Sequence, residues 1–365
     1  MIPVSEPDIS EKEIEYVDDA VRSGWVSSHG KYIDEFEDKF SEFIGTDYGL
    51  TVTNGTAAIH LAVSAIGIKE GDEVIVPDLT FISPVNAVLY NNARPVICDV
   101  EKDSWCIDTS KIEELITEHT KAIIAVHLYG NSSNMDELLK IKKKYNLYLI
   151  EDTAESLGTE YKNRKLGSFG DIGCFSFYGN KTMTTGEGGF CTTDNKELYE
   201  RMLLLRDHGM TSKKRYWHEF IGYNYRMTNM QAALGMAQLE RLNYFIKRKR
   251  EIADEYNKLL NGYVTTHPAG KDYNSTYWLY SILMEDEKQR DGLMEYLYKN
   301  GIDTRRFFYP VHAMPPYSKF GNGNYPVSVK LAETGINLPS SVRLTNEEIK
   351  YISGKIYDFL SREYN

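Results

Sequence analysis

The stretch KAIIAVHLYGNSSNMDELLKIKKKYNLYLIED, residues 121–152, places two apolar runs on either side of one amphipathic segment. The runs at 121–130 and 147–152 are nearly continuous in apolar residues, which is typical of strands covered on both faces. The segment at 134–146 has the apolar spacing of a helix. A strand, a helix and a strand in this order need a crossover connection, so we predict two parallel strands of an α/β sheet.

The same alternation continues toward the N-terminus. Further strands are predicted at 73–77 and 95–100, and a helix at 54–67. Repeated crossovers of this kind are typical of a three-layer α/β domain with a mostly parallel sheet. We assign this large domain to residues 1–240.

The remainder of the chain is predicted to form a smaller C-terminal α/β domain, residues 241–365. A long helical pattern at 228–260 leads into it, followed by a strand at 276–284 and a helix at 290–301. A helix at 10–23 is expected to pack on this smaller domain.

Composition limits the classes of partner. The chain has 365 residues, 42% apolar and 26% charged, with a formal net charge of −11. An acidic protein is not expected to bind nucleic acid, because phosphate backbones select basic surfaces. A small phosphorylated ligand stays compatible, since it needs only a local group of donors.

The cysteines and the N-terminus bear on location. Four dispersed cysteines form no CxxC pair, which fits a reducing compartment and predicts no metal site. The first residues show no charged region followed by an apolar run, and no stretch is long enough to cross a bilayer. The sequence therefore predicts a cytoplasmic protein without a membrane partner.

Chemistry-bearing residues gather where the strand at 147–152 ends. Glu151 and Asp152 close this strand, and ligands of open α/β sheets bind beyond the carboxyl ends of strands. Alone, such an acid is more often a helix cap or a structural carboxylate. Lys181 follows in FSFYGNKTMTTGEGG, residues 175–189, where small residues let the backbone approach a flat ligand.

A lysine amine and a carboxylate are the two fixed requirements of a pyridoxal 5′-phosphate (PLP) site. The third requirement is a helix N-terminus that can bind the phosphate. TVTNGTAAIHLAV, residues 51–63, places Asn54, Gly55 and Thr56 at the start of a helix. An NGT tripeptide alone is usually an ordinary helix start.

Two long segments carry a family resemblance. The segments EDTAESLGTEYKNRKLGSFGDIGCFSFYGNKTMTTGEGG (151–189) and YNYRMTNMQAALGMAQLERL (223–242) resemble the DegT/DnrJ/EryC1/StrS family of PLP-dependent sugar aminotransferases. The resemblance covers essentially the whole chain, from SGWVSSHGKYIDEFE to GINLPS. It implies the type I fold of PLP-dependent aminotransferases and a homodimer with active sites at the subunit interface.

The resemblance also implies roles for single residues. Lys181 is the expected Schiff-base lysine and Asp152 the expected partner of the pyridinium nitrogen. Glu155 is expected near the ring hydroxyl, and Phe81 is expected to stack on the ring. The phosphate contacts implied are Gly55, Thr56 and Ser176, with Asn224 contributed by the neighbouring subunit.

Some of these residues have ordinary alternatives when taken singly. Phe81 could be a core residue, Ser176 a polar strand residue and Asn224 a helix cap. Five further residues lie in segments that resemble substrate-facing loops, although packing or a solvated surface explains each equally well: Trp25, Ser27, Lys31, Tyr309 and His312.

The implied activity is transfer of an amino group from glutamate to C4 of a nucleotide-linked 4-keto-6-deoxy sugar. GDP-4-keto-6-deoxymannose is the first expectation, in the biosynthesis of polysaccharide or O-antigen. A sister group with histidine in place of the lysine removes a hydroxyl instead, so Lys181 favours transamination. Another keto-sugar nucleotide, a small keto-phosphate, or a regulatory protein on the same fold remain alternatives.

One departure from the family pattern concerns RRFFYP, residues 305–310. The family usually carries proline after the first arginine, whereas Arg306 follows Arg305 here. If this loop faces the sugar or the diphosphate, the extra cation is expected to change substrate choice.

Overall fold

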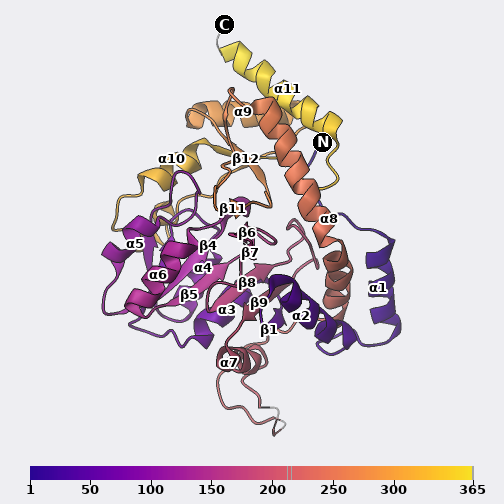
Figure 1. Cartoon of the computed structure of the whole chain (residues 1–365), viewed down its shortest axis with the longest axis vertical. Coiled ribbons are helices and arrows are strands. Elements are labelled where there is room, and N and C mark those ends of the chain that lie inside the picture. The colour runs from indigo at the N-terminus through magenta and orange to yellow at the C-terminus, as the bar shows by residue number, and fades with distance from the viewer. Residues whose placement is uncertain (212, 215, 364–365) are drawn as a thin grey trace.

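A computed structural model of the chain describes residues 1–211, 213–214 and 216–363. Its centre is a seven-stranded sheet in the order β1-β9-β8-β5-β4-β2-β3 (Figure 1). The strands are β1 (Tyr48–Val52), β2 (Glu73–Pro77), β3 (Arg94–Cys98), β4 (Thr120–Val126), β5 (Tyr148–Asp152), β8 (Ile172–Ser176) and β9 (Gly189–Thr193). Only β9 runs antiparallel to its neighbours in this sheet, so the predicted mostly parallel sheet is confirmed.

Helices cover both faces of the central sheet. In β2, Val74 and Val76 pack into the cluster on one face and Ile75 into the cluster on the other. Burial on both faces explains why the strands are continuous apolar runs. One face carries α3 (Gly55–Ala65), α4 (Ser83–Tyr90) and α7 (Lys196–Arg206), and the other carries α5 (Thr109–Leu115), α6 (Met135–Tyr145), α2 (Lys31–Ile44) and the start of α8 (Asn229–Leu260).

The strand predicted at 121–130 is shorter in the structure. β4 ends at Val126, and a short 3₁₀ turn, η1 (Leu128–Gly130), follows. Tyr129 and Gly130 have φ values of 53° and 102°, which lie in the left-handed region and end the strand. This turn places the Tyr129 amide 3.2 Å from the carboxylate of Glu155, which lines the cavity described below.

A second, smaller sheet lies above the central one in Figure 1. Its strands pair antiparallel in the order β10-β12-β14-β13. They are β10 (Thr265–Thr266), β12 (Tyr280–Leu283), β13 (Arg305–Arg306) and β14 (Gly335–Leu338). A separate hydrophobic cluster joins this sheet to α9 (Glu287–Lys299), α11 (Asn346–Glu363) and the second half of α8.

Several short elements complete the chain. A three-stranded sheet consists of β6 (Glu160–Tyr161), β7 (Arg164–Lys165) and β11 (Tyr273–Asn274). The others are α10 (Pro326–Thr334) and the 3₁₀ turns η2 (Val311–Ala313) and η3 (Ser318–Phe320). Within the described residues, no helix has both the length and the apolar character that a bilayer crossing requires.

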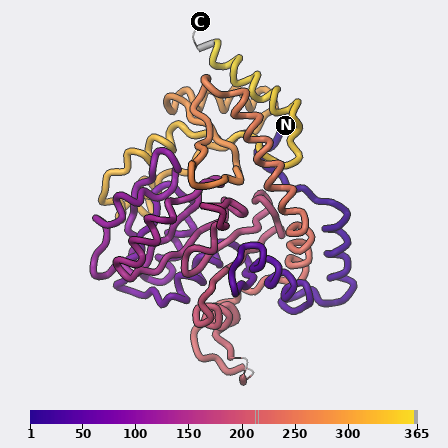
Figure 2. The backbone as a smooth tube through the Cα atoms, in the orientation of Figure 1, coloured from indigo at the N-terminus to yellow at the C-terminus, as the bar shows by residue number. Residues whose placement is uncertain are grey.

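The predicted domain boundary at residue 240 falls inside α8, which is a single helix of 32 residues. We therefore propose a division into two parts that share this helix. α1 (Glu11–Arg22) packs on its first half, where the Glu13 carboxylate accepts hydrogen bonds from Gln238 (2.7 Å) and Arg241 (2.9 Å). The segment before α1 reaches the second part, beside which the N-terminus lies in Figure 2, and Ile2 bridges Ile302 there.

Candidate active site

A cavity of about 570 Å³ lies where several parallel strands end. Val126, Asp152 and Ser176 are the last residues of β4, β5 and β8, and all three line it. This is the edge at which open α/β sheets bind ligands. Seven residues predicted to contact the cofactor line this cavity: Gly55, Thr56, Phe81, Asp152, Glu155, Ser176 and Lys181.

The N-terminus of α3 opens into the cavity. The Asn54 side chain caps this helix by accepting a first-turn amide at 2.8 Å. A Cβ on Gly55 would lie 2.7 Å from the Ser176 Cβ, so a larger residue would displace the strand end. The Thr56 and Ser83 hydroxyls lie 2.6 Å apart beside the first turn. Free amides and the helix dipole make this end suitable for an anion such as phosphate.

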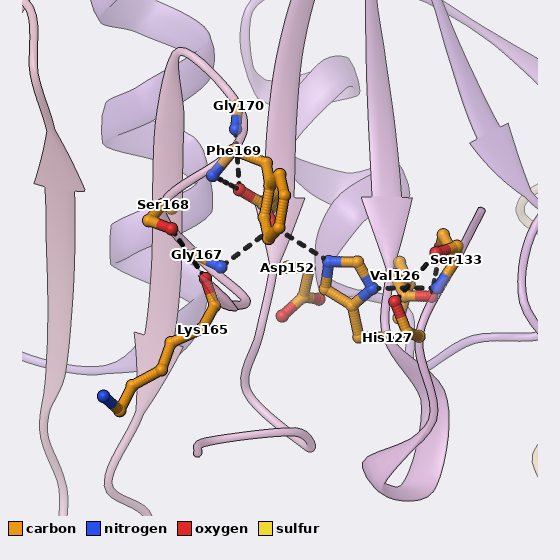
Figure 3. Close-up of polar contacts among 12 residues, drawn as sticks. Val126, His127, Ser133, Asp152, Lys165, Gly167, Ser168, Phe169 and Gly170 are labelled. Carbon is orange, nitrogen blue, oxygen red and sulfur yellow. Dashed lines mark hydrogen bonds and ion pairs between the residues drawn. The ribbon is translucent and has the colours of Figure 1, made fainter. Parts of the chain in front are cut away.

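The two adjacent acids of β5 face opposite ways, as alternate strand residues do. Glu151 is fully buried and is not among the residues that line the cavity. Its carboxylate accepts hydrogen bonds from the backbone N–H groups of Gly167 (2.9 Å), Phe169 (2.7 Å) and Gly170 (2.7 Å), and these three donor residues are labelled in Figure 3.

His127 is a fourth hydrogen-bond partner of the buried Glu151 carboxylate. The His127 Nε2 lies 3.2 Å from a Glu151 oxygen, and its Nδ1 accepts the Ser133 amide at 3.2 Å. This assigns the hydrogen of the ring to Nε2. Burial alone would raise the pKa of Glu151, but hydrogen bonds from His127 and from backbone amides hold that pKa below its ordinary value.

Asp152 points into the cavity. One of its oxygens accepts the Ala154 amide at 3.1 Å. Burial raises the pKa of Asp152, and the nearby charge of Lys181 opposes this only in part. A buried carboxylate in this state is matched to a cationic ligand group, such as a protonated ring nitrogen.

The Lys181 amine lies between an acid and an aromatic ring. Its Nζ is 3.3 Å from a Glu155 oxygen and 3.6 Å from the centroid of the Trp278 ring. The other Glu155 oxygen accepts the Tyr129 amide at 3.2 Å. Burial raises the pKa of Glu155, with Lys181 acting in the opposite direction. The site therefore holds an amine and two carboxyl groups, all with little exposure to solvent, in one cavity.

The residues predicted in the first substrate loop lie outside this cavity. The carbonyls of Trp25 and Ser27 accept hydrogen bonds from Asn229, at 2.7 Å and 2.6 Å. Lys31 pairs with Asp19 at 2.8 Å. These contacts hold the loop at the start of α8, and its substrate role stays a prediction.

The second substrate segment is also outside the cavity. The Tyr309 hydroxyl accepts a hydrogen bond from Arg306 at 2.5 Å, and the ring is exposed. His312 lies 2.8 Å from the buried Asp78 carboxylate. Their roles likewise remain predictions.

Asn224 does not reach the cavity of its own chain. It is exposed, and its backbone bridges Asp207. Its neighbour Tyr225 does line the cavity and places its hydroxyl 2.8 Å from the His60 Nδ1. Burial lowers the pKa of His60.

Trp278 and Arg305 are among the lining residues that were not predicted as site residues. Arg305 lines the cavity, whereas Arg306 stacks on Tyr309 (3.9 Å) and lies 3.9 Å from Glu287. Arg306 is not among the residues that line the cavity, because alternate residues of β13 face opposite sides, and its effect on substrate choice remains a prediction. The signal that could have identified Arg305 lies in the RRFFYP segment, where Arg306 departs from the family pattern.

Comparison with known proteins identifies the architecture. Residues 7–357 match the DegT/DnrJ/EryC1/StrS aminotransferase family. The chain belongs to this family. A GDP-perosamine synthase of Escherichia coli O157:H7 is 49% identical over 99% of both chains, and one of Vibrio cholerae is 43% identical over 99% of this chain and 100% of its own.

Solved structures agree with this assignment to the DegT/DnrJ/EryC1/StrS family. Helicobacter pylori PseC, an aminotransferase of pseudoaminic acid biosynthesis, has a TM-score of 0.93 and 30% identity over 99% of both chains. A Streptococcus pneumoniae protein in its PLP form has a TM-score of 0.94 and 30% identity over 99% of both chains. The chain is thus a PLP-dependent aminotransferase with the type I fold, as predicted.

The residues of the cavity fit this cofactor. The helix terminus at Gly55 suits the phosphate, the buried Asp152 suits a protonated ring nitrogen, and Lys181 supplies an amine in the same cavity.

The opposite orientations of Glu151 and Asp152 predict opposite effects on the stability of the cofactor-free protein. Glu151→Gln should lower the free energy of unfolding by about 3 kcal/mol, because an amide NH₂ would face buried donors. Asp152→Asn should be as stable as wild type or more stable at pH 7. The raised pKa of Asp152 means that its charged form costs stability above the ordinary value of 3.8, and this difference should vanish at lower pH.

Urea unfolding of both variants at pH 7 and near pH 4 measures these effects. Equal destabilisation by the two substitutions at pH 7 would contradict the assignment of Glu151 to the interior and Asp152 to the cavity.

Proposed function

We propose that this chain transfers the amino group of glutamate to C4 of GDP-4-keto-6-deoxymannose and forms GDP-perosamine. The observation that carries this proposal is the placement of Lys181 beside Glu155 and Asp152 in a cavity at the strand ends. The choice of sugar is supported by the identity to GDP-perosamine synthases over nearly complete chains. Another keto-sugar nucleotide and a small keto-phosphate remain as alternative acceptors.

The positions of the lining residues support the proposed contacts with the cofactor. Gly55, Thr56 and Ser176 would hold the phosphate of PLP, and Asp152 would pair with its ring nitrogen. Phe81 is half exposed at the cavity and is proposed to cover the ring. When bound, the cofactor supplies an electron sink for amino-group transfer.

Lys181 is proposed to move protons at its Nζ. The amine has a carboxyl partner, Glu155, at 3.3 Å and is only 12% exposed. A positioned amine of this kind typically contributes about 10² to 10⁴ in rate as a general acid and base. Low exposure also limits competing proton exchange with bulk water.

Arg305 is proposed as an anion-binding residue for the substrates. It lines the same cavity as Lys181, and among the described residues no carboxylate lies within ion-pair distance of it. A cation without an internal partner is suited to a carboxylate or a diphosphate of a substrate. Glutamate and a nucleotide sugar both carry such groups.

We also propose a homodimer. The chain after α7 extends away from the central sheet (Figures 1 and 2), and it carries four exposed apolar side chains: Tyr216, Trp217, Phe220 and Ile221. Such a concentration of exposed apolar residues is typical of an interface. Asn224 lies three residues after Ile221 and is exposed in its own chain, which supports a contact with the phosphate in the partner's site.

We also propose a cytoplasmic location. The four cysteines are free, which supports a reducing compartment.

The substrate proposal predicts turnover of one compound in a panel. With PLP and glutamate, the purified protein should aminate GDP-4-keto-6-deoxymannose at C4, as seen by mass spectrometry of the product. Turnover of only thymidine- or uridine-linked keto-sugars, or of a keto-phosphate, would move the activity to another acceptor. A PLP-binding protein that converts no member of the panel would favour the regulatory alternative.

The two neighbouring arginines give a matched pair of variants. Arg305→Gln should raise KM for glutamate, for the nucleotide sugar, or for both by about tenfold or more, because a charge-assisted contact is lost. Arg306→Gln removes the same charge one residue away, outside the cavity, and should leave both KM values within about twofold. Equal effects of the two variants would remove Arg305 from substrate binding.

A shared active site can be tested by mixing two impaired variants at a limiting concentration of cofactor. Lys181→Ala should be inactive and Asn224→Ala should bind the cofactor weakly. After unfolding and refolding together, a hybrid dimer has one site with both lesions and one with neither, so activity should reappear. Each variant refolded alone is the control. Hybrid dimers without regained activity would place both residues within one chain.

A further inference from the structure

The amine of Lys181 rests on the face of an indole ring. Its Nζ lies 3.6 Å from the centroid of Trp278, and the nearest Glu155 oxygen is 3.3 Å away. A cation above the face of tryptophan is attracted by the ring quadrupole, more strongly than by phenylalanine and more strongly when water is excluded. Trp278 is 4% exposed and lines the cavity.

Trp278 is fixed from three sides. Its indole N–H donates to the Asn180 carbonyl at 2.8 Å, directly before Lys181 in the chain. Its own carbonyl accepts a hydrogen bond from Lys249 at 2.9 Å, and the same amine donates to the Ser340 carbonyl at 2.9 Å. The Tyr129 ring lies nearly parallel to the indole at 6.2 Å. These contacts prevent the indole from following the lysine when the lysine moves.

Lys249 ties this arrangement to α8. It is buried, and burial lowers the pKa of its amine to about 7. Trp278 immediately precedes the second sheet, whereas Lys181 belongs to the loop after β8 of the central sheet. The indole is thus a surface that the second part of the chain presents to the reacting lysine of the first part.

We propose that Trp278 is a positioning residue whose indole face, together with the Glu155 carboxylate, forms a seat for the Lys181 amine whenever that amine is not bonded to the cofactor. The inference rests on the proposed role of Lys181. In that role the lysine must be released when the amino donor binds covalently in its place, and it must later return. A free lysine side chain has many rotamers, and a seat with two attractive sides keeps its amine close to the reacting atoms.

The seat predicts a graded change in the reactivity of Lys181 in the cofactor-free protein. Acetylation by an N-hydroxysuccinimide ester needs an amine that can leave the seat and reach the reagent, whereas contacts with the indole face and the Glu155 carboxylate keep the amine in the seat. We expect Lys181 to be acetylated about tenfold faster in Trp278→Leu than in wild type, and about threefold faster in Trp278→Phe. Tenfold corresponds to about 1.4 kcal/mol. Mass spectrometry of the peptide with Lys181 gives the rate, with the exposed Lys196 as internal standard.

A matched control separates the seat from general packing. Tyr129→Phe keeps the ring that packs on Trp278 and leaves the indole face intact, so Lys181 should be acetylated at the wild-type rate. Thermal unfolding of each variant shows whether the fold is retained. If Trp278→Leu does not fold, the comparison of Trp278→Phe with wild type decides.

Equal acetylation of Lys181 in wild type and in a folded Trp278 variant would overturn the proposal. A second readout is the rate of PLP uptake by the cofactor-free protein, followed by visible absorbance, which should differ from wild type in Trp278→Leu and stay unchanged in Tyr129→Phe. Neither measurement requires turnover of a sugar. A wrong acceptor would leave both results unchanged, so failure of the seat and failure of the proposed substrate are distinguishable.

Discussion

Four hydrogen-bond donors around the Glu151 carboxylate hold the edge of the central sheet at which the cavity lies. They tie the end of β5 to the turn at 167–170 and, through His127, to the end of β4. A carboxylate satisfied in this way is stable inside the protein, whereas a partly satisfied one is costly. Because Glu151 fixes the strand end from one face, Asp152 can be left with few partners on the other.

The order of strands and helices in the large part was largely predictable from the sequence. Burial on both faces requires nearly continuous apolar runs such as 147–152. Helix caps such as Asn54 mark the residues at which the crossover helices begin. Because both faces of these strands are buried, their residues do not alternate between polar and apolar, and the sequence does not show which face of the sheet each residue points to. The strand pattern therefore located Glu151 and Asp152 only as a pair, and the family resemblance supplied the choice of Asp152. For Arg305 and Arg306, the structure shows that Arg305 lines the cavity.

Trp278 escaped sequence reasoning for a different reason. It lies in a predicted strand, and an apolar aromatic in a strand is ordinarily a core residue. Its place beside Lys181 depends on how the second sheet is set against the first, and this is a long-range property of the fold. The positions of the loop at 25–31 and of the segment at 309–312 were equally hard to predict from the sequence. Contacts within one chain do not bring either of them to the cavity.

The continuity of α8 has a mechanical consequence. The helix has no proline and runs without a break from the central sheet to the second sheet, so it offers no loop in which φ and ψ could change cheaply. A connection of this kind behaves as a strut. The distance between Lys181 on one side of the cavity and Trp278 and Arg305 on the other is then fixed by this continuous helix. We expect related enzymes with the same fold to gain new acceptors by exchanging side chains at the mouth of the cavity, and not by closing one part of the chain onto the other.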